Sequence, residues 1–243
     1  MEAATSRLNG AHSIKVQINR LIKKGDYLTA CQVIKENLRG SQFDDLVREE
    51  FQSPDYKPAR IHKIIADLQV SIVATPNFDK VYEHQASSVP VKTYYDDGIA
   101  EAIRSPTGVI LKIHGSVDTP ARMIFSRIEY AQARNQYRVF YGILDALALT
   151  HTFLFLGCGL DDPDIRLVLE NYAFSHNYGR PHYYVIPKTL INKHVHSAIE
   201  KSLNVSLLTY DKRDSHRLLV DGLDDLVVRV SLNRTDLART QRW

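Results

Sequence analysis

The sequence predicts an α/β fold: a Rossmann-like parallel sheet with an inserted helical subdomain. From residue 70 onward, short apolar runs alternate with helical patterns of ten or more residues, as in βαβ units with parallel strands. A helical block at 11–69 precedes them, and no Gly/Ser linker separates the two parts. We therefore expect a single domain over 1–243. It comprises a helical module at 11–69, a Rossmann-like core at 70–228 and a polar tail at 229–243.

The composition is that of an ordinary globular protein. Of the 243 residues, 44% are hydrophobic and 24% are charged, and the net charge of +3 argues against nucleic acid as the main ligand. No apolar run reaches the roughly 18 residues of a membrane span, so we expect no membrane association. The two cysteines, Cys31 and Cys158, cannot build a disulfide framework or a four-cysteine zinc site. We expect a cytoplasmic protein without a bound metal.

Four amphipathic helices are predicted in the helical block. The first covers 14–24 and the second 27–38, which Asp26 can cap; the third follows Ser41 and the fourth covers about 59–69. The apolar stripes of the first and third helices are Ile14, Ile18, Leu21 and Ile22, and Phe43, Leu46, Val47 and Phe51.

The first predicted strand is the run VSIVAT at 70–75. It has no polar alternation, as expected of a strand buried on both faces. Further strands are predicted at 91–95, 109–113, 123–125, 152–156, 182–186 and 205–210, with later helices at 127–149, 164–176, 189–202 and 214–227. In open parallel sheets, ligands bind beyond the carboxyl ends of the strands, so the loops there are the candidate site.

Two such loops carry polar side chains suited to catalysis. In Thr75-Pro76-Asn77-Phe78-Asp79, Asn77 can donate and accept hydrogen bonds, and Asp79 lies at the start of the next helix. The alternative is that Asn77 or Asp79 only caps that helix. After the strand at 109–113, His114 is followed by glycine and serine. Such a histidine can accept a proton or bind a ribose hydroxyl near neutral pH, and the alternative is an ordinary surface histidine.

A third loop, Gly157-Cys158-Gly159, joins a strand to a helix. Glycines there let a ligand approach the backbone and the helix N-terminus, although the third glycine of a dinucleotide motif is replaced by Asp162. The alternative is a tight turn with Asp162 as N-cap. Cys158 is expected to pack as a small apolar residue rather than to act as a nucleophile.

Three strings together resemble the sirtuin-like NADase domains of bacterial anti-phage defence proteins. They are TPNFDKVYEH, VILKIHGSVDTPARMIFSRIEYAQ and TFLFLGCGLDDPDIRLVLENY. The helical module, the string YKPARIHKIIADLQVSIVAT and the tail VSLLTYDKRDSHRLLVDGLDDL agree with the same family, so the resemblance covers about 15–228. Members typically cleave NAD+ between nicotinamide and ribose and deplete it on infection. Lysine deacylation, the activity of related sirtuins with a four-cysteine zinc module, is the less expected one.

The resemblance implies specific roles. Asn77 matches the residue that positions the water or substrate near the nicotinamide ribose, Asp79 matches the residue that supports this loop, and His114 matches the catalytic histidine. NAD+ enters as substrate, and no metal is required. The residues implied in nucleotide binding are Thr75, Phe78, Gly115, Ser116, Gly157, Cys158, Gly159 and Asp211.

The chain departs from the family pattern in three places. Pro76 replaces a usual threonine, and Gly159 replaces a usual serine. Nothing before Ile14 resembles the family's opening strand with its Gly-Ala-Gly-type loop, and Asn9-Gly10-Ala11 is a poor substitute. We therefore expect the first strand and glycine loop to be absent here and to belong to a preceding segment of some tens of residues.

Two alternatives to an NAD+ glycohydrolase of abortive infection stay open. The same site could hold NAD+ or ADP-ribose without turnover and gate a partner. The helices could instead assemble a larger defence complex, with a translocase-type ATPase or an Argonaute-like partner as in some family members. The resemblance also implies a homo-oligomer.

Overall fold

The structure, a computed structural model, describes residues 2–8, 12–160, 162–176 and 179–240. Asn9-Gly10-Ala11 and the last three residues of the predicted tail lie outside the described residues. Two compact units are present: unit 1 is Met1–Lys63 with Val70–Phe140, and unit 2 is Ile64–Gln69 with Tyr141–Trp243. The domain boundaries drawn from the sequence stay a prediction, and each unit is described by itself.

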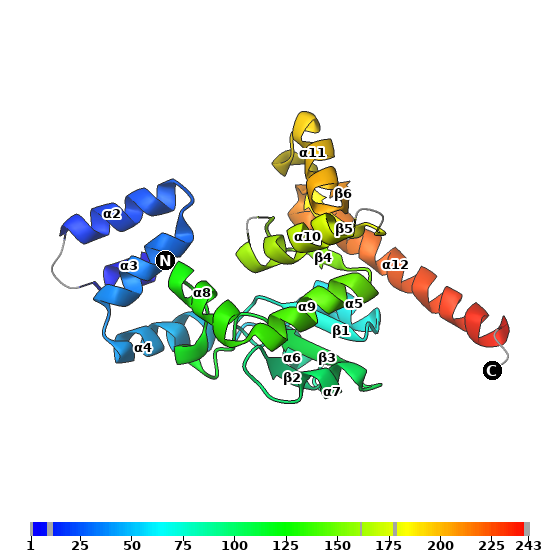
Figure 1. Cartoon of the computed structure of the whole chain (residues 1–243), viewed down its shortest axis with the longest axis horizontal. Helices are drawn as coiled ribbons and strands as arrows, with labels where there is room; N and C mark the ends of the chain where they lie inside the picture. The colour runs from blue at the N-terminus through cyan, green and yellow to red at the C-terminus, as the bar shows by residue number, and fades with distance from the viewer. Residues whose placement is uncertain (1, 9–11, 161, 177–178, 241–243) are drawn as a thin grey trace. The chain divides into compact units, whose positions relative to one another are not determined.

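The helical part of unit 1 contains α1 (Glu2–Ser6), α2 (His12–Lys23), α3 (Tyr27–Asn37) and α4 (Gly40–Phe51), which gather near the N-terminus in Figure 1. The Asp26 carboxylate caps α3 by accepting from the Thr29 N–H at 3.3 Å, as predicted. The buried core of these helices consists of Ala4, Leu8, Ile18, Ala30, Ile34, Leu38 and Leu46. The predicted stripe of α2 faces this core, whereas the stripe of α4 is divided: Leu46 belongs to this core, and Phe43, Val47 and Phe51 pack in a second cluster with Val117 and Met123. The fourth predicted helix is α5 (Arg60–Asp67).

The sheet of unit 1 has three parallel strands in the order β1-β3-β2. These are β1 (Ile72–Thr75), β2 (Val91–Thr93) and β3 (Val109–Lys112), and they are joined through α6 (Val81–Gln85) and α7 (Ile99–Arg104). Only the central strand β3 is buried throughout. The prediction that β1 is buried on both faces is wrong, because β1 lies at the edge of this sheet and its Ala74 is exposed.

The strand predicted at 123–125 does not form. A 3₁₀ turn, η1 (Pro120–Arg122), leads into this segment, and the Ile124 N–H donates to the His114 carbonyl at 3.0 Å. Met123 and Ile124 are 1% and 2% exposed. The apolar triplet thus reflects burial beside the His114 loop and not a place in a strand ladder. The single helix predicted at 127–149 is two, α8 (Arg127–Gln136) and α9 (Arg138–Thr150), interrupted at Tyr137.

Unit 2 has a second parallel sheet in the order β4-β5-β6. Its elements are β4 (Leu154–Leu156), α10 (Pro163–Ser175), β5 (His182–Pro187), η2 (Lys188–Leu190), α11 (Lys193–Leu203), β6 (Val205–Tyr210) and α12 (Arg213–Thr240). The core comprises Ile165, Leu169, Tyr184, Ile186, Leu203, Val205 and Leu207. The parallel sheets of both units confirm the predicted α/β class with parallel pairing.

Helix α12 is longer than the pattern at 214–227 predicts. It bends near its start, where Asp214, Ser215 and His216 have positive φ, and then continues to Thr240 (Figure 1, orange to red). Its polar C-terminal part is exposed. Ion pairs one helical turn apart, such as Arg229–Asp225 at 2.7 Å, favour helix in such a segment. No helix among the described residues is long and apolar enough to cross a membrane.

Candidate functional site

The Asn77 loop and the His114 loop leave the same edge of the unit 1 sheet. Strands β1 and β3 pair in parallel with Thr75 opposite Lys112, so the two loops follow adjacent strand ends. Their backbones are joined directly, because the Val117 N–H donates to the Phe78 carbonyl at 3.0 Å. The sequence-predicted residues of unit 1 are therefore assembled at one edge of one sheet.

The Asn77 loop is held by short-range bonds. The Asn77 N–H donates to Thr75 Oγ1 at 3.1 Å, and Asn77 itself is exposed. Asp79 Oδ1 accepts from the N–H of Val81, the first residue of α6, at 2.9 Å, but the N-cap of this helix is Lys80 and not Asn77 or Asp79. Phe78 turns inward, and its ring lies 4.3 Å from that of Phe125 between centroids. Asn77 is thus exposed, whereas Phe78 and Asp79 are half-buried.

His114 is buried rather than a surface histidine, with 3% of its surface exposed. Its Nδ1 lies 3.4 Å from the Tyr130 hydroxyl, and the two rings meet edge to face at 5.0 Å. Gly115 follows at φ +90°, and a Cβ placed on it would lie 2.7 Å from the Arg122 carbonyl oxygen. Ser116 is also buried, with its Oγ 3.4 Å from an Asp118 carboxylate oxygen. The imidazole is therefore held in a tightly packed turn.

One polar cluster at this edge, centred on Lys112, was not predicted from the sequence. Lys112, the last residue of β3, is completely buried, and its ammonium donates to the carbonyls of Phe78 (3.2 Å) and Asp79 (2.5 Å). It also pairs with Glu83 Oε1 at 2.5 Å. The available clue in the sequence is a lysine inside the otherwise apolar run VILKI. Tyr130, the partner of His114, carries no comparable clue because it lies in an ordinary helical pattern.

Unit 2 contains the glycine loop, directly after β4. Gly157 has φ +67°, and a Cβ added to it would meet nothing within 4 Å, so a side chain there would be opposed only by the backbone conformation. Asp162 accepts from the N–H groups of Asp164 and Ile165, at 3.0 and 3.1 Å, and Pro163 opens α10. The N-cap alternative is thus realised at this turn.

Cys158 and Asp211 belong to the same edge of the unit 2 sheet. The Cys158 carbonyl accepts from the Tyr184 hydroxyl at 2.8 Å, and burial raises the pKa of the Cys158 thiol, as expected for a packed residue. Asp211 follows β6. A hydrogen bond from Lys188 at 2.8 Å, with Arg213 as second partner, holds the pKa of its carboxyl well below the usual range. Asp211 is therefore already engaged in ion pairs.

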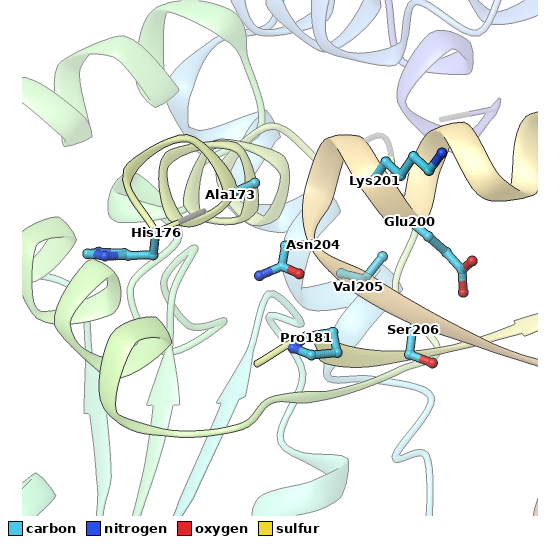
Figure 2. Close-up of a pocket in the computed structure, with 8 residues that line it drawn as sticks. All are labelled: Ala173, His176, Pro181, Glu200, Lys201, Asn204, Val205 and Ser206. Atoms are coloured by element: carbon cyan, nitrogen blue, oxygen red, sulfur yellow. The ribbon is translucent and has the colours of Figure 1, made fainter. Parts of the chain in front are cut away.

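A cavity of about 440 Å³ lies at the opposite edge of the unit 2 sheet. Figure 2 shows its wall, formed by Ala173, His176, Pro181, Glu200, Lys201, Asn204, Val205 and Ser206. Two of its polar groups are committed, since Glu200 accepts from the Leu207 N–H at 3.0 Å and the Asn204 amide donates to the Gly179 carbonyl at 3.1 Å. None of the sequence-predicted site residues lines it. In the part of the chain that the structure describes, no group of three or more His, Cys, Asp or Glu residues is placed to hold a metal ion.

Comparison with known proteins gives one family and several relatives. The model of the SIR2-like domain matches residues 71–208, more than half of the chain. NAD(+) hydrolase ThsA of Enterococcus faecium is 28% identical over 184 residues, covering 72% of this chain and 38% of the relative. NAD(+) hydrolase ThsA of Acinetobacter baumannii (strain 532279) is 26% identical over 181 residues, covering 70% and 37%. The chain thus spans less than two-fifths of the length of these curated relatives.

Proposed function

The chain belongs to the SIR2-like domain family, and on that premise we propose that it is the NAD+-cleaving domain of an NAD+ glycohydrolase of anti-phage defence. One observation carries the proposal: Asn77 and His114 follow adjacent parallel strands, joined by the hydrogen bond between Val117 and Phe78. The carboxyl edge of a parallel sheet is where ligands bind in open α/β folds. Relatives named NAD(+) hydrolases support NAD+ as the substrate.

The proposed reaction needs few groups from the protein. The bond between the ribose C1′ and the nicotinamide nitrogen breaks, and both electrons pass to the nitrogen. Water adds to C1′ of the oxocarbenium-like centre and loses a proton. The products are nicotinamide, ADP-ribose and a proton. We assign the orientation of the water and ribose hydroxyls to the exposed amide of Asn77, and proton acceptance to the imidazole of His114.

Supporting roles follow from the contacts around these two residues. Tyr130, 3.4 Å from His114 Nδ1, orients the imidazole, and Asp79 supports the Asn77 loop through its bond to the Val81 N–H at the start of α6. Within unit 1, we assign nucleotide contacts to Thr75, Phe78 and the backbone around Gly115 and Ser116. Within unit 2, we assign ribose and phosphate contacts to Gly157, Cys158 and Gly159, and a ribose contact to Asp211. A homo-oligomer, a cytoplasmic location and a defence partner belong to the same proposal.

The test is nicotinamide release from NAD+ by the purified chain, followed by chromatography. We expect His114→Ala and Asn77→Ala each to abolish release while circular dichroism stays unchanged. The matched control is His84→Ala, which removes an exposed histidine on α6 and should leave release unaltered. Undiminished release in both site variants would refute these assignments.

A silent binding module is the second candidate, and the burial of His114 favours it. A site whose histidine is 3% exposed can hold a nucleotide against its loops without admitting water to that ring. Calorimetry with NAD+ and ADP-ribose separates the two functions. Tight binding without nicotinamide release supports the module, whereas absence of binding at millimolar nucleotide contradicts it.

A further inference from the structure

The ammonium of Lys112 is the anchor of the Asn77 loop in unit 1. Lys112 is the last residue of β3, and it is 0% exposed, so its ammonium does not reach solvent. It lies within 3.2 Å of the Phe78 carbonyl and 2.5 Å of the Asp79 carbonyl, the two residues that follow Asn77. Burial of an ammonium is expensive unless every proton has an acceptor, and here two of the acceptors are backbone groups of a single loop.

The third acceptor of the Lys112 ammonium is the carboxylate of Glu83. Glu83 lies on α6, and its carboxylate pairs with Lys112 at 2.5 Å while its side chain is 12% exposed. The lysine therefore joins three parts of the unit: the end of β3, the loop after β1, and the helix that the loop enters. The Phe78 carbonyl accepts a second bond, from the Val117 N–H three residues beyond His114.

We propose that Lys112 and Glu83 form a positioning pair that sets the distance between the Asn77 loop and the His114 turn. Lys112 precedes His114 by two residues on the same chain segment, so its bonds to the Phe78 and Asp79 carbonyls tie the two loops together. Neither residue needs to touch the substrate. The effect on turnover rests on the proposed function, whereas the anchoring of the loop does not.

The surroundings distinguish this pair from an ordinary ion pair. Surface pairs in this chain, such as Arg229–Asp225, are mostly exposed and contribute little. Replacing a buried pair by apolar residues of similar length is often neutral for stability. A pair kept only for stability is therefore replaceable, whereas a positioning pair is not, because apolar side chains cannot hold the two loop carbonyls.

The experiment replaces both partners in the full chain by residues of similar length, Lys112→Met with Glu83→Met. Amide hydrogen exchange is followed at Val117, whose N–H bonds to Phe78, and at Val109, whose N–H bonds to the Ser71 carbonyl at 2.9 Å near the other end of β3. We expect exchange at Val117 to rise by about tenfold or more while exchange at Val109 stays unchanged. If both amides keep their wild-type rates, the proposal is overturned.

Two further variants make the result specific. Lys92→Met is the matched control: it removes a lysine of the neighbouring strand β2 that also bonds a loop carbonyl, that of Asp97 at 2.9 Å, and it should leave Val117 protected. Glu83→Gln keeps an acceptor for Lys112, so exchange at Val117 should stay within about threefold of wild type. If the double variant does not fold, Glu83→Ala, which removes the side-chain acceptor of Lys112, decides, and wild-type exchange at Val117 in that variant overturns the anchoring.

Turnover is measured on the same variants. In the double variant we expect kcat for nicotinamide release to fall by about a hundredfold, with a smaller change in KM, because loop misplacement acts on the reacting geometry. Faster Val117 exchange with unaltered turnover would refute the positioning role. If the wild-type chain itself releases no nicotinamide, the proposed function fails for this chain, and the exchange rates still decide the anchoring.

Discussion

Replacing Gly115 by alanine tests the packing of the turn that carries His114. Gly115 has φ +90°, and the added methyl group would lie 2.7 Å from the Arg122 carbonyl oxygen, which belongs to the backbone and cannot swing away. A positive φ costs an alanine about 1–2 kcal/mol. Forcing apart a packed backbone contact adds about 1–3 kcal/mol. We therefore expect Gly115→Ala to lower the free energy of unfolding by about 2–5 kcal/mol.

Gly25→Ala is the matched control for this measurement. Gly25 lies in the same unit at φ +76°, but a Cβ there meets nothing within 4 Å. It should cost only the conformational part, about 1–2 kcal/mol. Urea denaturation monitored by circular dichroism gives both values, provided that the slope with urea is unchanged between variants. Equal destabilisation by the two substitutions would refute the close approach of Gly115 to Arg122.

Two further predictions concern ionisation. NMR titration should find the Asp211 carboxyl ionised well below its ordinary pKa, and Lys188→Met should move the pKa up toward about 4. Since the pKa is lowered in the folded state, the stability contributed by this carboxylate is complete above a pH of about 4, roughly the unfolded pKa, and is lost as the pH falls through the folded value. An unshifted pKa in the wild type would contradict the Lys188 contact. Burial raises the pKa of Tyr94 to about 12, so ultraviolet titration should show this phenol still protonated at a pH of about 11, where exposed tyrosines ionise. The stability that Tyr94 contributes is therefore present below a pH of about 10, roughly the unfolded pKa, and is lost as the pH rises through the pKa of the folded state. Tyr94→Phe should remove the 2.8 Å bond to the Arg122 carbonyl and lower the free energy of unfolding by about 1 kcal/mol. A titration curve that does not change in Tyr94→Phe would rule out this assignment.

The helices of the N-terminal module illustrate what local sequence can predict. The spacing of Ile14, Ile18, Leu21 and Ile22 repeats with the helical period, and a helix with such a stripe needs a core to cover it. Asp26 is recognisable as a cap because capping joins groups only three residues apart. Such features depend on neighbours along the chain, which the sequence displays directly.

The candidate site could be predicted only in part. Asn77 and His114 are recognisable because polar residues directly after apolar runs mark strand ends, and parallel strands bring those ends to one edge. The residues that contact Asn77 and His114 cannot be recognised in this way. Tyr130 lies 16 positions after His114, and nothing in the helical pattern of α8 distinguishes the face on which it lies.

The sequence by itself determined the α/β class, the parallel pairing and the position of the candidate loops at strand ends, because hydrophobic period and short-range hydrogen bonding are encoded within a few residues. Only the tertiary structure decided that β3 is central and β1 an edge strand, that Met123 is buried without joining a strand, and that Lys112 meets the Phe78 carbonyl 34 positions away. Strand order depends on which crossover packs best over the whole sheet. The contacts of the buried Lys112 depend on that strand order, so no local sequence pattern predicts them.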